Sequence, residues 1–200
     1  MRLGRLIAPV LMLVMLAGCA VEVGAPYEEI ARARYSATDD PYVAVVSMVS
    51  TRTGRAAHTA LFINASERVI YDPAGTFEHR DMPERGDIHY GATDRMIDYY
   101  ERYHARLSHF VHVQKIPVSR QVAEATLRRA QAQGPSPKSF CTTHTIDVLN
   151  DVGGLPRFEN SFYPEKLRKQ VDRLPAVVDR YVYEYDSDKA LPPEALGLTN

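Results

Sequence analysis

The chain is poor in cysteine, has no apolar run long enough to span a membrane, and carries no large excess of charge. Its 200 residues include 2 cysteines, too few for a framework of disulfide bonds. The apolar stretch from Leu6 to Leu16 is too short to cross the hydrocarbon core of a bilayer. No internal repeat and no low-complexity segment is found. A hydrophobic content of 45% then indicates one ordinary globular domain.

The charges give no electrostatic reason to expect a nucleic-acid partner. The chain has 24 basic and 25 acidic side chains, and without Arg2 and Arg5 it has 22 and 25, a balance of −3. Nucleic-acid binding depends on clustered positive charge, which this balance does not supply. Membrane attachment would therefore depend on a covalent lipid and not on a basic patch.

The N-terminus has the three parts of a secretory signal. Two arginines precede the short apolar stretch, and the small residues Ala17-Gly18 follow it. We therefore predict that residues 1–18 are a signal peptide. Residues 19–40 are polar and predicted to be a tether, with a short helix around 27–34. A domain over 41–186 and a flexible tail over 187–200 complete the expected organisation.

The segment Leu16-Ala17-Gly18-Cys19 resembles the bacterial lipobox, in which the cysteine is diacylated and becomes the new N-terminus. This resemblance implies that Cys19 is the lipidated residue. The alanine at position 20, where inner-membrane lipoproteins carry aspartate, implies sorting to the periplasmic face of the outer membrane. The alternative is a plain secreted protein with a chance cysteine at this position.

The middle of the chain alternates between strand-like and helix-like patterns. Runs rich in β-branched and aromatic residues predict an antiparallel meander, and amphipathic runs predict helices beginning at Thr93 and Ser119. We expect an α+β fold, an antiparallel sheet packed against helices. The expected strands are 42–50, 58–63, 68–72, 110–118 and 181–185, and the expected helices are 93–107, 119–133 and 164–174.

Cys141 begins a further helical run. Ser139 is its expected N-cap and Gly153-Gly154 its expected end. At a helix N-terminus, unpaired N–H groups and the helix dipole favour a thiolate and could hold an oxyanion. With Cys19 occupied by lipid, Cys141 has no disulfide partner, so that it is either a buried small hydrophobe or a functional thiol.

His58 and Asp72 are the candidate partners of this thiol. His58 begins one predicted strand and Asp72 ends the next, so a hairpin between them brings both to the same edge of the sheet. A thiol nucleophile needs a base, and the base is usually oriented by a third polar group. His58 is equally compatible with an ordinary strand histidine, and Asp72 with a turn residue before Pro73.

The segments His58-Thr59-Ala60-Leu61-Phe62-Ile63, Val69-Ile70-Tyr71-Asp72 and Phe140-Cys141-Thr142-Thr143-His144 resemble the papain-like NlpC/P60 superfamily. The histidine precedes the cysteine, which is typical of the circularly permuted branch of amidases, peptidases and lecithin-retinol-acyltransferase-like enzymes. The resemblance covers most of 41–186. It implies a permuted papain-like architecture with Cys141 as nucleophile, His58 as base and Asp72 as orienting residue.

The chain departs from that pattern at several points. The third catalytic position in relatives is often His, Asn or Gln, and only Tyr42 and Tyr90 suggest themselves as side-chain donors to an oxyanion. The run Gly86-Asp87-Ile88-His89-Tyr90 is similar to a glycine-aspartate strand motif of the superfamily, but it follows His58 where the motif precedes it. We interpret this similarity as chance.

The remaining histidines do not predict a metal site. His144 is expected to be a helix-face residue, with a donor behind the nucleophile or an alternative base as the other options. His104, His109 and His112 suggest no shared face, and a single Cys-x-x-His pair is weak evidence for zinc. We expect no cofactor and no metal, although a metal-dependent hydrolase remains a third hypothesis for the function.

The sequence thus predicts a monomeric, lipid-anchored cell-envelope hydrolase or acyltransferase that works through a thioester on Cys141. Its expected partners are a peptidoglycan peptide or an acyl lipid as substrate, and the membrane through the N-terminal lipid. The rival hypothesis is a non-catalytic envelope lipoprotein that uses a papain-like scaffold for binding or assembly.

Overall fold

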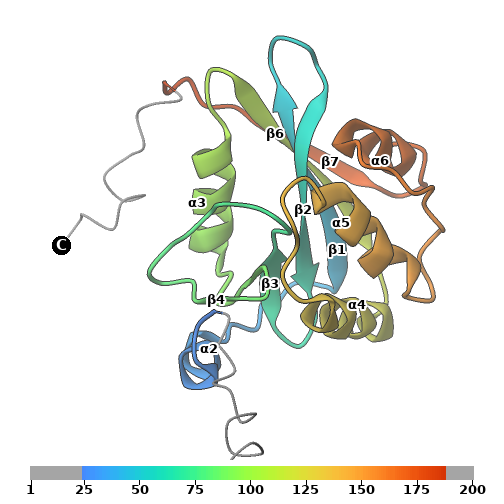
Figure 1. Ribbon diagram of the computed structural model, residues 1–200. Coiled ribbons are helices and arrows are strands. Elements are labelled where there is room, and N and C mark those ends of the chain that lie inside the picture. Colours follow the sequence, from blue (N-terminus) through green and yellow to red (C-terminus); the bar gives the residue numbers. More distant parts are fainter. Residues whose placement is uncertain (1–23, 188–200) are drawn as a thin grey trace, which may run out of the picture.

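The computed structural model describes residues 24–187, which form an α+β fold around one antiparallel sheet (Figure 1). One helix covers one face of the sheet, and three helices cover the other face. This confirms the expected fold class. The predicted signal peptide, the lipidation residue Cys19 and the tail from residue 188 lie outside the described residues.

The sheet has seven strands in the order β4-β5-β3-β2-β1-β6-β7. The strands are β1 (Tyr42–Ser50), β2 (Ala56–Asn64), β3 (Arg68–Tyr71), β4 (Glu84–Arg85), β5 (Ile88–His89), β6 (His109–Pro117) and β7 (Val178–Val182). The helices are α2 (Tyr27–Ala33), α3 (Asp94–His104), α4 (Arg120–Gln133), α5 (Cys141–Asn150) and α6 (Pro164–Val171). Among the described residues, no helix is both long enough and apolar enough to cross a membrane.

The central strand β1 is buried on both faces, which explains its continuous run of apolar residues. Val43 and Val45 pack in the core shared with α4, α5 and α6. Ala44 and Val46 pack in a second core against α3. The alternation of strand side chains therefore divides the interior into two layers, one on each side of the sheet.

The predicted meander of β1, β2 and β3 is confirmed, but β3 is short. It pairs with β2 only from Leu61 to Asn64. Within the described part of the chain, no strand continues this pairing along residues 56–60. The first half of β2 therefore keeps a free backbone edge on that side, beside the N-terminus of α5.

A β-bulge lies directly beside His58. In the pairing of β1 with β2, Met48 faces His58 and Val49 faces Ala56, so that Ala57 is the extra residue. The Ala56 N–H donates to Glu165 Oε2 at the start of α6, at 2.9 Å. Bulges redirect the strand and its side chains, and this one is held by a carboxylate from the neighbouring helix.

Several element boundaries differ from the predicted ones. The caps at Thr93 and Ser119 are confirmed by hydrogen bonds to Met96 N and Val122 N. However, α3 ends at His104 and not at 107. The last strand is 178–182 instead of 181–185, because β7 takes its register from its pairing with β6 and not from its own aromatic residues.

The segment before residue 41 is more than a tether. Ile30 of α2 is buried in the main core, and Asn64 donates to the Asp39 and Asp40 carbonyls. Residues 73–91, where the sequence predicts no strand, contain the short strands β4 and β5. Both features depend on contacts with distant residues, which local sequence patterns do not encode.

Candidate active site

Cys141 is the first residue of α5 and is 7% exposed. The first N–H groups of a helix have no intrahelical acceptor, so they point towards the space in front of the helix. The predicted cap is wrong: Phe140 is the N-cap residue, and Ser139 has a left-handed backbone with φ 72°. The helix also ends at Asn150, before the two glycines. The predicted placement of the thiol at a helix N-terminus is confirmed.

His58 and Asp72 are joined by a short hydrogen bond. The Nε2–H of His58 donates to Oδ1 of Asp72 at 2.5 Å. Asp72 directly follows Tyr71, which pairs with Leu61, so it lies at the end of the β2–β3 pairing on the side of His58. A carboxylate can only accept, which assigns the proton to Nε2 and leaves Nδ1 for another partner. The predicted meeting of these residues is confirmed.

Cys141 is a second neighbour of His58, and each of the two side chains stabilises the charged form of the other. Thr142 Oγ1 lies 3.8 Å from the sulfur. The backbone of Thr59, in the part of β2 that β3 does not reach, also lowers the pKa of the thiol.

The charges of the three side chains support one another. Burial opposes the charged form of His58, but the charge and hydrogen bond of Asp72, with a smaller contribution from Cys141, raise its pKa to about 10. Burial likewise opposes the thiolate, and the hydrogen bond and charge of His58 outweigh it, so the pKa of Cys141 is lowered. The pKa of Asp72 is lowered against burial by His58. The lowered pKa of Cys141 and the raised pKa of His58 both favour a thiolate–imidazolium pair.

Asp72 lies in a fully buried pocket lined by ring side chains. Burial, reinforced by the negative charge of Asp72, raises the pKa of Tyr100 well above its ordinary value. Burial lowers the pKa of His89 and lowers that of His104 to about 4, even though Asp72 acts in the opposite direction on both. Of the four ring side chains near Asp72, namely His58, His89, Tyr100 and His104, His58 is therefore the one that is charged at neutral pH.

Gly75 leaves just enough room for the Asp72 carboxylate. A Cβ at this position would lie 2.2 Å from Oδ2 and 2.5 Å from Oδ1 of Asp72. The Gly75 N–H also donates to the Asp72 carbonyl at 3.0 Å, which closes the turn over the side chain. Any other residue at position 75 must displace the carboxylate from His58.

We expect Gly75→Ala to lower the rate of Cys141 alkylation at neutral pH by about tenfold, because a displaced Asp72 no longer holds the imidazolium. The matched control is Gly153→Ala, where an added Cβ meets nothing within 4 Å. The two variants are compared by iodoacetamide labelling and thermal unfolding. Equal labelling rates in both variants would contradict the role assigned to Gly75.

Asp87 connects the loop that precedes Cys141 with the turn that follows Asp72. Its Oδ2 accepts from the Ala74 N–H at 3.2 Å and from the Ser136 N–H at 2.7 Å. Its backbone carbonyl accepts from the Asp72 N–H at 2.8 Å. The interpretation of the Gly86-Asp87 run as chance therefore missed a positioning residue. The available sequence signal is the Gly86-Asp87 pair, which is typical of a tight turn, and both residues have left-handed backbones between β4 and β5.

His144, Tyr42 and Tyr90 do not reach the sulfur. His144 Nδ1 bonds the Ser136 hydroxyl at 2.7 Å, so it stabilises the approach to α5, as a helix-face residue would. Tyr42 and Tyr90 line two larger hollows, of about 450 and 620 Å³, away from Cys141. The suggestion that either tyrosine serves an oxyanion is wrong, which leaves the backbone N–H groups at the start of α5.

A hollow of about 270 Å³ opens beside His58. Gly75 and Thr76 form one side of it, and His104 and His109 form another. The expectation that these two histidines share no face is therefore wrong, because α3 ends against the start of β6. The hollow offers space for a small group next to the His58 imidazole.

The neutral, half-buried His104 predicts a fold that acid destabilises. Its pKa is lowered from 6.5 to about 4, so the unfolded chain binds more protons in this range, and stability falls as the pH falls. At about 1.4 kcal/mol for each pH unit, the free energy of unfolding falls by an amount of the order of 3 kcal/mol. In urea unfolding between pH 7 and 4.5, we expect this free energy to fall less steeply with decreasing pH in His104→Gln than in His109→Gln. An unchanged slope would contradict this role.

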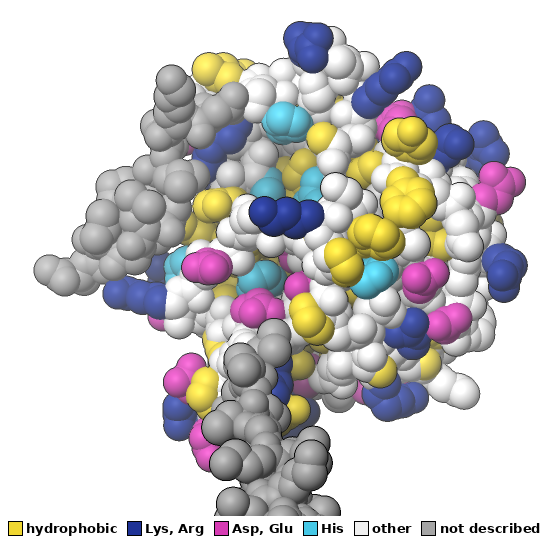
Figure 2. Space-filling view, in the orientation of Figure 1, with side chains coloured by type: hydrophobic (Ala, Val, Ile, Leu, Met, Phe, Trp, Pro, Cys, Tyr) yellow, Lys and Arg dark blue, Asp and Glu magenta, His cyan; other side chains and the backbone are white. Residues whose placement is uncertain are grey.

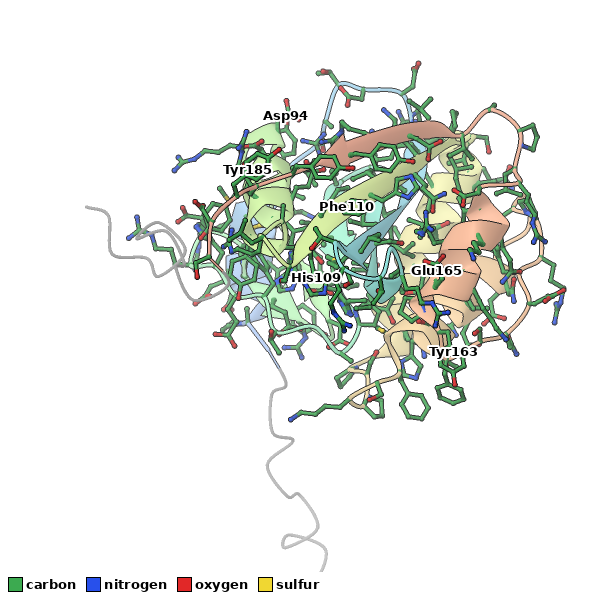
Figure 3. All side chains as sticks on the ribbon, turned by 90° about the horizontal axis from the view of Figure 1, so that it is seen from above. Asp94, His109, Phe110, Tyr163, Glu165 and Tyr185 are labelled. Atoms are coloured by element: carbon green, nitrogen blue, oxygen red, sulfur yellow. The ribbon has the colours of Figure 1, made fainter. Side chains whose placement is uncertain are left out.

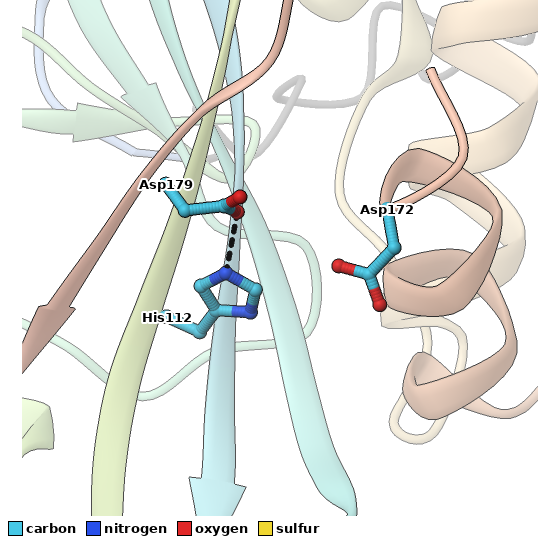
Figure 4. Close-up of side chains that lie close together, drawn as sticks. All are labelled: His112, Asp172 and Asp179. Atoms are coloured by element: carbon cyan, nitrogen blue, oxygen red, sulfur yellow. Dashed lines mark hydrogen bonds and ion pairs between the residues drawn. The ribbon is translucent and has the colours of Figure 1, made fainter. Parts of the chain in front are cut away.

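His112 lies on the other face of the sheet, in a cluster with Asp172 and Asp179 (Figure 4). The three side chains offer ligand atoms within 4.8 Å of one another. However, His112 Nε2–H donates to Asp179 at 2.7 Å, and Arg168 lies 3.4 Å from Nδ1 as a donor. Both imidazole nitrogens are thus engaged, and a metal ion would have to displace Arg168. We interpret the cluster as an ion-pair network that fastens α6 and β7 to β6.

Comparisons of the chain with protein-family models, with curated proteins and with solved structures find no match. The resemblance to the NlpC/P60 superfamily stays a prediction.

Proposed function

We propose that the protein is a cysteine hydrolase or acyltransferase of the permuted papain-like type, acting on amide or ester bonds in the cell envelope. The observation that supports this most strongly is that His58 hydrogen-bonds Asp72, while His58 and Cys141 each stabilise the charged form of the other. An ordinary buried cysteine has no need for a charged imidazole, whereas a nucleophile does.

The first half of the reaction forms a thioester. The Cys141 thiolate attacks the substrate carbonyl carbon, and the electron pair of the C=O bond moves to oxygen. Backbone N–H groups at the start of α5 are the available donors to this oxyanion. As the intermediate collapses, the bond to the leaving amine or alcohol breaks, and that group takes a proton from His58.

The second half regenerates the enzyme. Neutral His58 removes a proton from water, or from the hydroxyl or amine of an acceptor, which attacks the thioester carbonyl. Collapse expels the thiolate and restores the ion pair with His58. Water gives hydrolysis and another acceptor gives acyl transfer, so the same three residues serve both reactions. Asp72 keeps the imidazole oriented throughout.

The order of the three residues agrees with the family resemblance. A histidine near the start of one strand, a carboxylate after the next and a cysteine opening a later helix are arranged as in the permuted branch. Within this proposal Cys19 carries the lipid, and the domain acts at the periplasmic face of the outer membrane. Peptide amides of the cell wall and acyl groups of lipids are the two candidate substrate classes.

Acyl transfer to Cys141 tests this function. The full chain is incubated with an activated acyl ester, and its intact mass is measured before and after treatment with neutral hydroxylamine. We expect one acyl group per chain, located on Cys141, removed by hydroxylamine and absent in Cys141→Ser. A panel of muropeptides and acyl lipids then assigns the substrate class. Failure of native Cys141 to be acylated, while unfolded chain is acylated, would contradict the proposal.

One observation favours the non-catalytic rival. Cys141 is only 7% exposed, and the hollow beside His58 is not lined by Cys141 itself. In the rival, the scaffold binds or assembles without chemistry, and the thiol stays slow towards every acyl donor. The acylation experiment separates the two, because the rival predicts no mass increase in the folded chain.

A further inference from the structure

Three aromatic side chains form an exposed rim next to the nucleophile. This aromatic rim consists of Phe140, Phe162 and Tyr163. Phe162 is 59% and Tyr163 66% exposed, and the rings of Phe140 and Phe162 are 5.3 Å apart. Tyr163 projects away from the body of the protein (Figure 3), and apolar side chains gather over α5 and α6 on this face (Figure 2). Large apolar side chains exposed together mark a contact surface.

The rim lies in a locally basic environment. Residues 134–144 and 155–170, which carry it, hold five basic and two acidic side chains, although the whole chain has a net charge of −1. The Lys166 ammonium lies 5.7 Å from the centre of the Tyr163 ring, and the Lys169 side chain is 62% exposed. One of the two acids, Glu165, pairs with both Arg168 and Lys169. The net charge of the whole chain does not reveal this local excess of basic side chains.

Aromatic side chains surrounded by lysines have the composition of a surface that enters the headgroup region of a bilayer. The rings bury their apolar area near the acyl chains, and the ammonium groups remain among the phosphates. Each basic side chain near an anionic bilayer contributes about 1 kcal/mol of attraction. A protein partner would also cover the rings, but it would need a matching acidic surface, which an anionic bilayer supplies in any orientation.

We propose that the aromatic rim rests on a bilayer that contains anionic phospholipid and brings Cys141 to the membrane surface. The rim begins one residue before Cys141, so a bilayer in contact with Phe140 lies next to the start of α5. This deepens the proposed function by favouring acyl groups of lipids as its substrates, and in that respect it rests on the proposed function. The membrane contact itself does not require catalysis.

A single introduced tryptophan tests this contact, because the chain contains none. Phe162→Trp is compared with Tyr185→Trp, which is equally conservative and replaces a side chain 80% exposed on the other side of the protein (Figure 3). The full chain is reconstituted into vesicles of phosphatidylcholine with or without phosphatidylglycerol. Because any N-terminal anchor acts on both variants alike, the difference between them isolates the rim.

We expect the emission of the Phe162→Trp variant to shift to shorter wavelength in phosphatidylglycerol vesicles and to be quenched by brominated acyl chains. The Tyr185→Trp variant should show neither effect, and Lys138→Glu with Lys166→Glu should reverse the shift. Identical emission in both tryptophan variants, or a shift that does not depend on anionic lipid, would overturn the proposal. Alkylation of Cys141 in the same samples reports separately on the proposed function.

Discussion

Cys141→Ala abolishes turnover, with an expected loss of at least about 10³-fold in kcat on the substrate that the panel identifies. Without the sulfur no thioester can form, and the backbone N–H groups at the start of α5 can only polarise a bound carbonyl. Cys141→Ser is expected to be almost as inactive. A hydroxyl is far less acidic than a thiol, so His58 cannot hold it ionised at neutral pH.

The other cysteine supplies the matched control for this loss. Cys19→Ser removes a thiol outside the described residues and should leave kcat on a soluble substrate unchanged. Thermal unfolding of Cys141→Ala measures how far the small cavity destabilises the fold. We expect the free energy of unfolding to fall by about 1 kcal/mol for a side chain of this size. Turnover that survives Cys141→Ala would contradict the assignment of the nucleophile.

Asp72→Asn is expected to lower kcat by about 10³-fold near neutral pH, which is the second large effect. Asparagine keeps the shape of the side chain but removes the charge that outweighs the burial of His58. The pKa of His58 should then fall towards or below its ordinary 6.5, and the pKa of Cys141 should rise as the imidazolium is lost. The variant is therefore expected to need a higher pH to form its thiolate.

The pH dependence of stability changes with the same substitution. The pKa of Asp72 is lowered below 3.8, so its charge contributes stability above that pH and loses it on acidification. The charged form of His58, whose pKa is raised to about 10, contributes its full stabilisation below pH 6.5, and this stabilisation is lost as the pH rises through 10. Unfolding curves and kcat are measured from pH 4 to 10. Asp98→Asn, which removes an exposed surface partner of Arg102, is the control and should match the wild type.

The parts of the site that the sequence predicted are those encoded within a few residues. The β1–β2–β3 meander follows from β-branched runs separated by short turns, and its pairing places His58 and Asp72 at one edge. The start of the Cys141 helix follows from the break at Pro137 and the apolar spacing after it. The caps at Thr93 and Ser119 were predictable because a hydroxyl oxygen accepts a hydrogen bond from the N–H three residues later.

The parts that the sequence did not predict depend on distant contacts. Asp87 binds Ser136, 49 residues later, and no local pattern encodes that pairing. The Ala57 bulge exists because Glu165 of α6 holds the Ala56 N–H. Ser139 looks like a cap by residue type, but the chain turns through a left-handed conformation there. Long-range packing overrides local preference at each of these points.

The rate of Cys141 alkylation as a function of pH tests the central claim most directly. Native full-length chain is treated with iodoacetamide from pH 5 to 10, and modified Cys141 is quantified by mass spectrometry. The ion pair with His58 predicts labelling at neutral pH, with a midpoint below the ordinary thiol pKa of 9.0 that moves upward in Asp72→Asn. A midpoint at or above 9.0 in the wild type, unmoved by that substitution, would contradict the account.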